Sequence, residues 1–159
     1  MPIIIDGHNL LWAIQTPGED SHLLTDLRLC YIIGRYLKLI DETGEIVFDG
    51  KGPPDKSGFD NISNLEVLFA GLTTDADSVI EDKIRANTAP KRLKVVSSDR
   101  RVRDAARARK AETIKSDIFW NNLQKQLTTK KTIKEPTAKQ LGLSEGETDQ
   151  WLKFLGLEQ

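Results

Sequence analysis

The sequence predicts an α/β fold built on a doubly wound, mainly parallel sheet. Two observations support this prediction. Short β-branched runs alternate with segments of helical periodicity over residues 1–127, and three of those runs end in an aspartate. Alternating strands and helices favour parallel strands joined by helical crossovers. In such sheets ligands bind beyond the carboxyl ends of the strands, so those aspartates mark the expected site.

The predicted strands are short and apolar, as is typical of strands covered on both faces of a sheet. In chain order they comprise residues 3–5, 45–48, 65–69, 93–96 and 112–114. Asp6 follows the first strand, Asp49 the second and Asp99 the fourth. The carboxyl ends of these strands therefore each present an acidic residue.

Helices are predicted where apolar residues recur every three or four positions. They comprise residues 21–40, 75–87, 100–110 and 116–127. Thr73 to Asp75 resembles a capped helix start, and Ser116 is a second candidate cap. Ile118 and Phe119 are expected to face the core. The Gly/Pro-rich residues 51–57 are expected to form a loop.

Residues 128–159 are expected to be separate from the domain at 1–127. The polar, lysine-rich stretch 128–134 has the composition of a linker. Beyond it, residues 144–155 predict a short amphipathic C-terminal helix. A helix this short is marginal alone, so its apolar face should dock on the main body or on another molecule.

Length and composition narrow the class of protein. A chain of 159 residues suits one core. No run approaches the ~20 apolar residues of a membrane span, and the N-terminus lacks signal-peptide features. A cytoplasmic protein with no membrane partner is expected. Cys30 is the only cysteine, which excludes an internal disulfide and a thiolate-rich metal site and fits a reducing compartment.

The charges are distributed unevenly along the chain. Residues 1–82 hold 5 basic and 15 acidic residues, a net charge of −10, whereas residues 83–134 hold 16 basic and 4 acidic residues, a net charge of +12. This asymmetry suits a cation site beside a surface that binds a polyanion such as RNA. Two solvated faces that neutralise each other explain it equally well.

Five carboxylates can converge at the expected site. Asp77 and Glu81 lie four residues apart on one helix, so both can face the side where Asp6, Asp49 and Asp99 end their strands. Clustered carboxylates repel one another and call for a compensating cation. Oxygen ligands without a His/Cys set favour Mg²⁺ or Mn²⁺, which promote phosphodiester hydrolysis.

Each of these residues also has a structural interpretation, because Asp-Gly is a turn signal and Asp caps helices. Asp75 is interpreted as such a cap and is not placed among the metal ligands. Asn9 is a candidate to position Asp6 or a phosphate. His8 is as well explained as a solvent-facing residue.

Basic residues surround the fourth predicted strand and fill the helix after Asp99. The candidate RNA-binding residues are Lys91, Arg92, Arg100, Arg101, Arg103 and Arg107. The spacing of Arg100, Arg103 and Arg107 places them on one helix face, which can line a phosphate track or simply solubilise the helix. Without a base-reading motif, contact with the RNA backbone is expected.

Four motifs in order resemble the YacP-like branch of the NYN domain family, within the PIN-like nuclease superfamily. They are Ile3–Leu11 (IIIDGHNLL), Val47–Gly50 (VFDG), Asp75–Glu81 (DADSVIE) and Val95–Asp99 (VVSSD). The resemblance covers residues 1 to about 127 and leaves 128–159 outside. The opening is also similar to the 5′-nuclease domain of bacterial DNA polymerases, a more distant relative.

The resemblance implies a PIN-like, Rossmann-like three-layer fold and an endoribonuclease that uses Mg²⁺ or Mn²⁺. It implies Asp6, Asp77 and Asp99 as catalytic metal ligands, and Glu81 as a further ligand or a water-orienting group. Asn9, Asp49 and Ser98 are the supporting residues. Structured RNA or the ribosome is the implied partner, since some YacP-like proteins associate with ribosomes.

Two other functions are weighed against a ribonuclease. A catalytically weak RNA-binding module could share the fold. A phosphatase with an aspartyl nucleophile would need a second Asp two residues after Asp6, where His8 stands. The full acidic set favours the nuclease, because it costs stability unless a metal compensates it.

Overall fold

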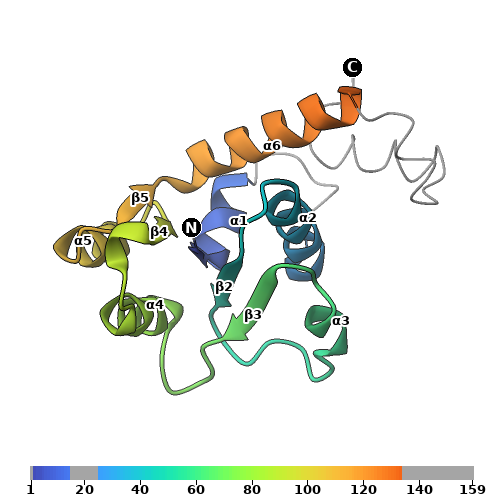
Figure 1. The fold of residues 1–159 in the computed structure, drawn as a ribbon. Coiled ribbons are helices and arrows are strands. Elements are labelled where there is room, and N and C mark those ends of the chain that lie inside the picture. The colour runs from blue at the N-terminus through green and yellow to red at the C-terminus, as the bar shows by residue number, and fades with distance from the viewer. Residues whose placement is uncertain (1, 15–24, 134–159) are drawn as a thin grey trace. The chain divides into compact units, whose positions relative to one another are not determined.

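A computed structural model describes residues 2–14 and 25–133. It contains a five-stranded sheet, whose arrangement with the helices is drawn in Figure 1. The strands are β1 (Ile3–Asp6), β2 (Gly44–Phe48), β3 (Leu65–Phe69), β4 (Lys94–Val96) and β5 (Glu112–Ile114). All four strand pairs are parallel, in the order β3-β2-β1-β4-β5. The predicted α/β class and all five predicted strands are therefore confirmed.

The helices begin largely where the sequence supplies caps. They are α1 (Gly7–Ile14), α2 (Asp26–Leu39), α3 (Ser57–Asp60), α4 (Ala76–Ala86), α5 (Arg100–Ala108) and α6 (Ser116–Ile133), with a 3-10 turn η1 (Pro90–Arg92). Thr25, Asp75 and Asp99 cap α2, α4 and α5 by accepting hydrogen bonds from first-turn amides.

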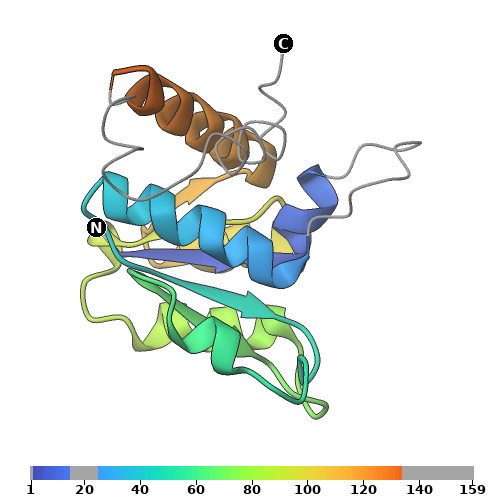
Figure 2. The ribbon, with the colours of Figure 1, turned by 90° about the vertical axis from the view of Figure 1, so that its right-hand side faces the viewer.

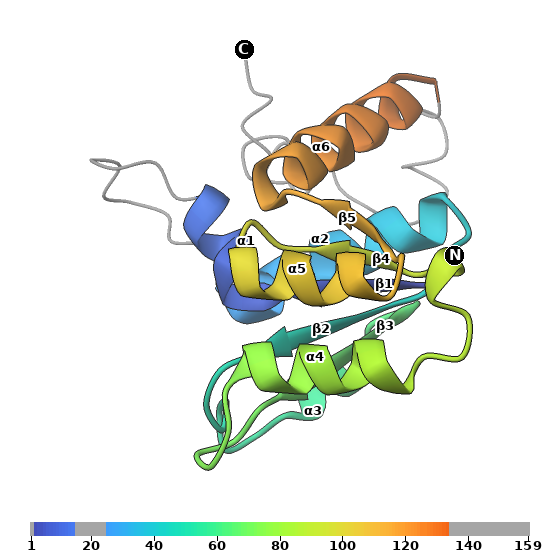
Figure 3. The same cartoon turned by 90° about the vertical axis from the view of Figure 1, so that its left-hand side faces the viewer.

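Helices cover both faces of the sheet. Helices α4 and α5 lie side by side on one face (Figure 3), where Ile80, Ile84, Val102 and Ala106 pack with Ile4 and Val95 of the strands. Helix α2 covers the other face, with α1 and α3 beside it (Figure 2). Because side chains alternate along a strand, Asp6 points to the same face as Ile4, toward α4 and α5.

The strand order reverses next to β1. The chain passes from β1 to β2 and β3 on one side and then crosses to β4 and β5 on the other. Ile5 pairs in register with Val96, so Ser97 follows β4 at the level where β1 ends in Asp6. The carboxyl ends of β1 and β4 thus form the switch point at which α/β sheets bind ligands.

Three elements differ from the sequence-based expectation. Helix α1 was not predicted; it begins directly after β1 and buries Leu10 and Leu11. Helix α3 falls at the end of the expected loop. Helix α6 continues to Ile133, so residues 128–133 are helical and do not form a linker. Lysine tolerates a helix, and the Thr128 hydroxyl bonds the carbonyl of Gln124 one turn back at 2.7 Å.

The prediction that Ile118 faces the core is wrong. Its side chain is 47% exposed, whereas the neighbouring Phe119 is buried and meets the Tyr36 ring edge-on at 5.8 Å. Consecutive helical residues differ in direction by about 100°; in α6 the buried side of the helix includes Phe119 and Leu123, and Ile118 lies beside it.

The predicted helix start at residues 21–24, the last linker residue and the C-terminal helix at 144–155 lie outside the described residues. The chain divides into two compact units, residues 1–119 and 120–159. The first contains the whole sheet and α1 to α5. Among the helices that are described, none combines the length and apolar character of a membrane span.

Gly7 is expected to be essential for the start of α1. A Cβ at this position would lie 2.5 Å from two ring carbons of Phe48 and 3.0 Å from the Val47 carbonyl oxygen. Phe48 is fully buried. Gly7→Ala should therefore lower the free energy of unfolding by about 1–3 kcal/mol in urea denaturation.

Gly58→Ala is the matched control, because its Cβ would meet only Leu27 at ordinary contact distances of 3.4 and 3.5 Å. It should be neutral or slightly stabilising. Equal losses in both variants would show that the close approach at Gly7 does not limit the packing.

Candidate functional site

Asp6 is the most buried acidic residue at the carboxyl edge of the sheet. Its side chain follows the buried run Ile3–Ile5, and the residue is only 4% exposed. Burial is the largest cause that raises its pKa, to about 6, and the carboxylates of Asp77 and Asp99 add to the rise. Hydrogen bonds from the Ser97 hydroxyl and from the backbone N–H of Asn9 oppose the rise.

Asp77 and Asp99 bring charge of the same sign toward Asp6. Asp77 lies in the first turn of α4, and Asp99 caps α5. Burial, followed by the carboxylates of Asp99, Asp75 and Asp49, raises the pKa of Asp77. We call Asp6, Asp77 and Asp99 the acidic cluster. These three residues were predicted from the sequence and come from separate parts of the chain. Asp77 and Asp99 lie near enough to Asp6 for their charges to raise its pKa.

Ser97 joins two members of the acidic cluster. It is fully buried, and its hydroxyl donates to Asp6 Oδ2 at 3.0 Å and accepts the backbone N–H of Asp99 at 3.0 Å. The sequence interpretation selected Ser98 and missed Ser97. The missed signal is its position, because the residue directly after β4 is level with the last residue of β1.

Asn9 and Ser98 fix the backbone around the acidic cluster. Asn9 Oδ1 accepts the Ser98 N–H at 2.8 Å and the Ser116 hydroxyl at 2.7 Å, and Ser98 Oγ accepts the Ser116 N–H at 3.0 Å. These bonds connect α1, the end of β4 and the start of α6. The Asn9 side-chain oxygen therefore has a structural role, since it accepts both of these hydrogen bonds.

Asp49 also has a structural task. Its Oδ1 accepts the N–H of Ala76, the first residue of α4, at 2.8 Å. Its own N–H donates to His8 Nδ1 at 3.2 Å, so the half-buried His8 has a partner inside the protein.

Asp75 accepts the Ser78 N–H at 2.7 Å, and bonds to Ser78 lower its pKa, with a smaller effect of Arg101. Asp75 is therefore the cap that the sequence predicted.

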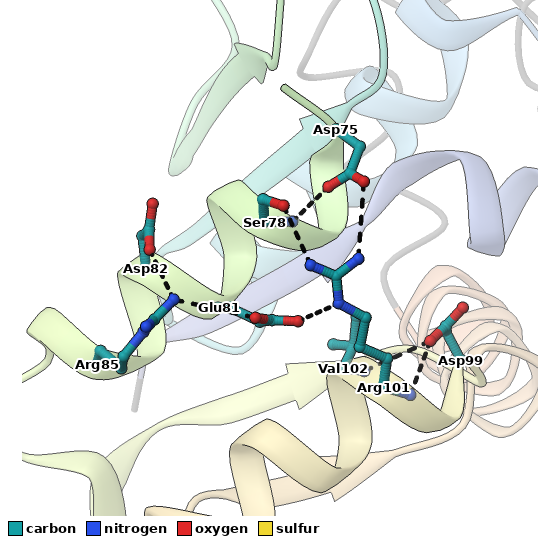
Figure 4. Close-up of polar contacts among 8 residues, drawn as sticks. All are labelled: Asp75, Ser78, Glu81, Asp82, Arg85, Asp99, Arg101 and Val102. Atoms are coloured by element: carbon teal, nitrogen blue, oxygen red, sulfur yellow. Dashed lines mark hydrogen bonds and ion pairs between the residues drawn. The ribbon is translucent and has the colours of Figure 1, made fainter. Parts of the chain in front are cut away.

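The four-residue spacing of Asp77 and Glu81 predicted that both would face the site, but Glu81 does not join the acidic cluster. Its carboxylate bonds the guanidinium of Arg101 and lies 3.9 Å from that of Arg85 (Figure 4). It is not among the charges that raise the pKa of Asp6 or Asp77. Glu81 lies a full turn further along α4 than Asp77, away from the helix start.

The candidate RNA-binding residues divide between two edges of the sheet. Lys91 and Arg92 are exposed in η1, which precedes β4, so they lie at the amino ends of the strands, opposite the acidic cluster. Arg100, Arg103 and Arg107 are on α5, which starts at the carboxyl edge. Lys91 and Arg92 are therefore separated from the arginines of α5 by the length of the strands.

The donor chemistry of the acidic cluster fits a hard divalent cation. It offers oxygen only, and mutual repulsion helps to raise the pKa of Asp6 and Asp77, which a nearby cation would counteract. Across residues 2–14 and 25–129, no group of three or more His, Cys, Asp or Glu side chains has the arrangement to hold a metal ion. The cluster thus has suitable ligands that are not drawn together around a common point.

Comparison with known proteins identifies one family. The family model of the YacP-like NYN domain matches residues 3–153, well past the limit near residue 127 that the motifs suggested. No curated protein matches the sequence.

Two solved structures share the fold. Rae1 (YacP) from Bacillus subtilis superposes with a TM-score of 0.69 at 16% sequence identity, covering 98% of this chain and 92% of that one. A tryptophan-to-leucine mutant of Rae1 gives 0.64 at 17% identity, over 87% and 84% of the two chains. The predicted PIN-like fold is therefore confirmed.

The raised pKa of Asp6 predicts a specific dependence of stability on pH. The folded state binds the proton more tightly than the unfolded state, in which the pKa is about 3.9. Stability should therefore fall as pH rises from about 4 through 6, by about 3 kcal/mol from this group alone. Asp6→Asn removes that dependence, because an amide does not ionise.

Urea denaturation in EDTA should show similar stabilities of wild type and Asp6→Asn near pH 4. At pH 7 the variant should be more stable by up to about 3 kcal/mol. A variant that is less stable than wild type at both pH values would identify the Asp6 carboxylate as a structural group.

Proposed function

This chain belongs to the YacP-like NYN domain family, and we propose that it is a metal-dependent endoribonuclease that hydrolyses RNA phosphodiester bonds at the carboxyl edge of its sheet. The acidic cluster is the observation that supports this most directly. Three carboxylates from β1, α4 and α5 approach one another at the switch point, and two of them have raised pKa values. Such an arrangement is costly for a protein that binds no cation there.

In this proposal Asp6, Asp77 and Asp99 hold Mg²⁺ or Mn²⁺. Both capping bonds of Asp99 go to Oδ1, so Oδ2 is its candidate ligand atom. When bound, the cation would activate a water molecule and stabilise charge on the phosphoryl oxygen. Ser97 holds the Asp6 carboxylate in place, and the burial of Asp6 limits the access of competing water.

Helix α5 is the proposed RNA track. It starts at the acidic cluster, and Arg100, Arg103 and Arg107 follow one another at three- and four-residue spacing along it. Arg103 also donates to the Ser97 carbonyl at 3.5 Å, which ties the track to the cluster. Lys91 and Arg92 would contact only an RNA long enough to reach the opposite edge of the sheet.

Structured or ribosome-bound RNA in the cytoplasm is the proposed natural substrate, in line with the family resemblance. A catalytically weak RNA-binding module is the second candidate. It is favoured by the absence, among the described side chains, of a ready-made three-ligand metal arrangement. Cleavage assays separate the two.

Purified protein should cut labelled single-stranded and structured RNAs internally in Mn²⁺ or Mg²⁺ and not in EDTA. Asp6→Asn and Asp77→Asn should each reduce the rate by at least about 100-fold, because each removes a proposed metal ligand. Gel analysis of the products checks this prediction.

Asp82→Asn is the control, since Asp82 is also on α4 but is 75% exposed and pairs with Arg85 at 2.8 Å. It should cleave at the wild-type rate. Binding of RNA by wild type without cleavage in either metal would instead support the binding module.

The RNA track predicts a salt dependence. Arg100→Gln with Arg107→Gln should weaken binding to single-stranded RNA. The slope of log K against log salt should flatten by roughly 0.7 for each lost phosphate contact. Fluorescence anisotropy over a salt series measures that slope on a short RNA.

The double variant Lys91→Gln with Arg92→Gln removes the same charge from the opposite edge. It should leave the slope for the short RNA unchanged. If this control flattened the slope and the α5 variant did not, the track would lie at the amino edge.

A further inference from the structure

Arg101 contacts three groups along one face of α4. Its Nε bonds Glu81 Oε1, its Nη2 donates to Ser78 Oγ at 3.1 Å, and its Nη1 lies 3.6 Å from Asp75 Oδ2 (Figure 4). Its own backbone N–H donates to Asp99 Oδ1 at 2.8 Å. One residue therefore connects the first turns of α4 with the cap of α5, and both elements carry members of the acidic cluster.

We propose that Arg101 is the resident counter-ion of the site: it holds Glu81 in the metal-free protein, and a divalent cation must compete with it for that carboxylate. This inference rests on the proposed metal-dependent function. It makes Arg101 a positioning residue, in contrast to its sequence-based assignment as an RNA contact.

The charges around Arg101 support this role. Among the described residues, Arg101 is the cation that lowers the pKa of Asp77, and it acts there against Asp99, Asp75 and Asp49. Thus the positive charge of Arg101 already offsets part of the repulsion that the acidic residues create. Arg101 therefore compensates part of the acidic charge from within the protein itself.

The geometry also allows a divalent cation to replace Arg101 at Glu81. The Arg101 side chain is 50% exposed, so its bonds compete with water and are weaker than those of a buried pair. Glu81 is 21% exposed and lies one helical turn from Asp77. Arg85, at 3.9 Å from Glu81, is 67% exposed and bonds Asp82 at 2.8 Å. A divalent ion carries twice the charge of a guanidinium and can displace it from Glu81.

The guanidinium of Arg101 already has protein partners, so it is less available to an RNA phosphate. Its Nε, Nη1 and Nη2 each face a group on α4. Arg100, the preceding residue, is exposed. Loss of Arg101 should therefore change mainly Mn²⁺ affinity, whereas loss of Arg100 should change mainly RNA binding.

The test compares Arg101→Gln with Arg100→Gln, which removes the same charge one residue away. Isothermal titration with Mn²⁺ alone should show about fivefold tighter binding to Arg101→Gln, because the substitution removes a positive charge that competes for Glu81. Arg100→Gln should show a smaller change, and Arg101→Lys should stay within about twofold of wild type because it keeps the charge.

Two readouts besides Mn²⁺ affinity separate this role from RNA contact. In EDTA the Tm of Arg101→Gln should be lower than that of wild type, and saturating Mn²⁺ should raise it by more. The salt slope for RNA binding should be unchanged by Arg101→Gln and flattened by Arg100→Gln. A flattened slope with unchanged Mn²⁺ affinity would make Arg101 an RNA contact and overturn the proposal.

Glu81→Gln tests the route through Glu81. In that background, Arg101→Gln should change Mn²⁺ affinity less than it does in wild type. An equal change in both backgrounds would overturn the competition for Glu81. Metal-dependent cleavage with the same Mn²⁺ affinity in wild type and Arg101→Gln would overturn only this inference. Failure of every protein to bind Mn²⁺ would overturn the proposed metal site as well.

Discussion

The buried hydroxyl of Ser97 is the interaction on which the site depends. It bonds the carboxylate of Asp6 and the backbone amide of Asp99 at the same time, and thereby fixes the end of β1 against the start of α5. Parallel pairing of β1 with β4 makes this contact possible, because it brings both strand ends to one level. Without the Ser97 hydroxyl, the buried Asp6 carboxylate would lose one of the two hydrogen bonds that compensate for its lost solvation.

The acidic residues of this protein serve structure and electrostatics together. Asp49, Asp75 and Asp99 accept hydrogen bonds from helix-start amides, where the positive end of the helix dipole favours a carboxylate. The same bonds orient α4 and α5 so that Asp77 and Asp99 approach Asp6. Capping of α5 and membership of the acidic cluster are therefore compatible for Asp99, since the cap positions the carboxylate.

The basic residues, in contrast, have separate roles. Arg101 turns toward α4 and neutralises acidic neighbours, whereas Lys91 and Arg92 lie at the far edge of the sheet. A count of charge along the chain treats these residues alike. Their physical roles differ because a guanidinium within bonding distance of a carboxylate acts mainly on that carboxylate, while an exposed one contributes to the field over the surface.

The sequence by itself determined the strands, the starts of α4, α5 and α6, and the carboxyl edge as the location of Asp6, Asp77 and Asp99, because strand composition, helical periodicity and capping are local properties. It did not determine α1, whose eight residues follow β1 without a break, or the helical continuation beyond residue 127. Only the tertiary structure decided that Ser97 bonds Asp6 across 91 positions and that Glu81 pairs with Arg101 across 20. Those partners are set by strand order and by the packing of α4 against α5, which no local pattern encodes.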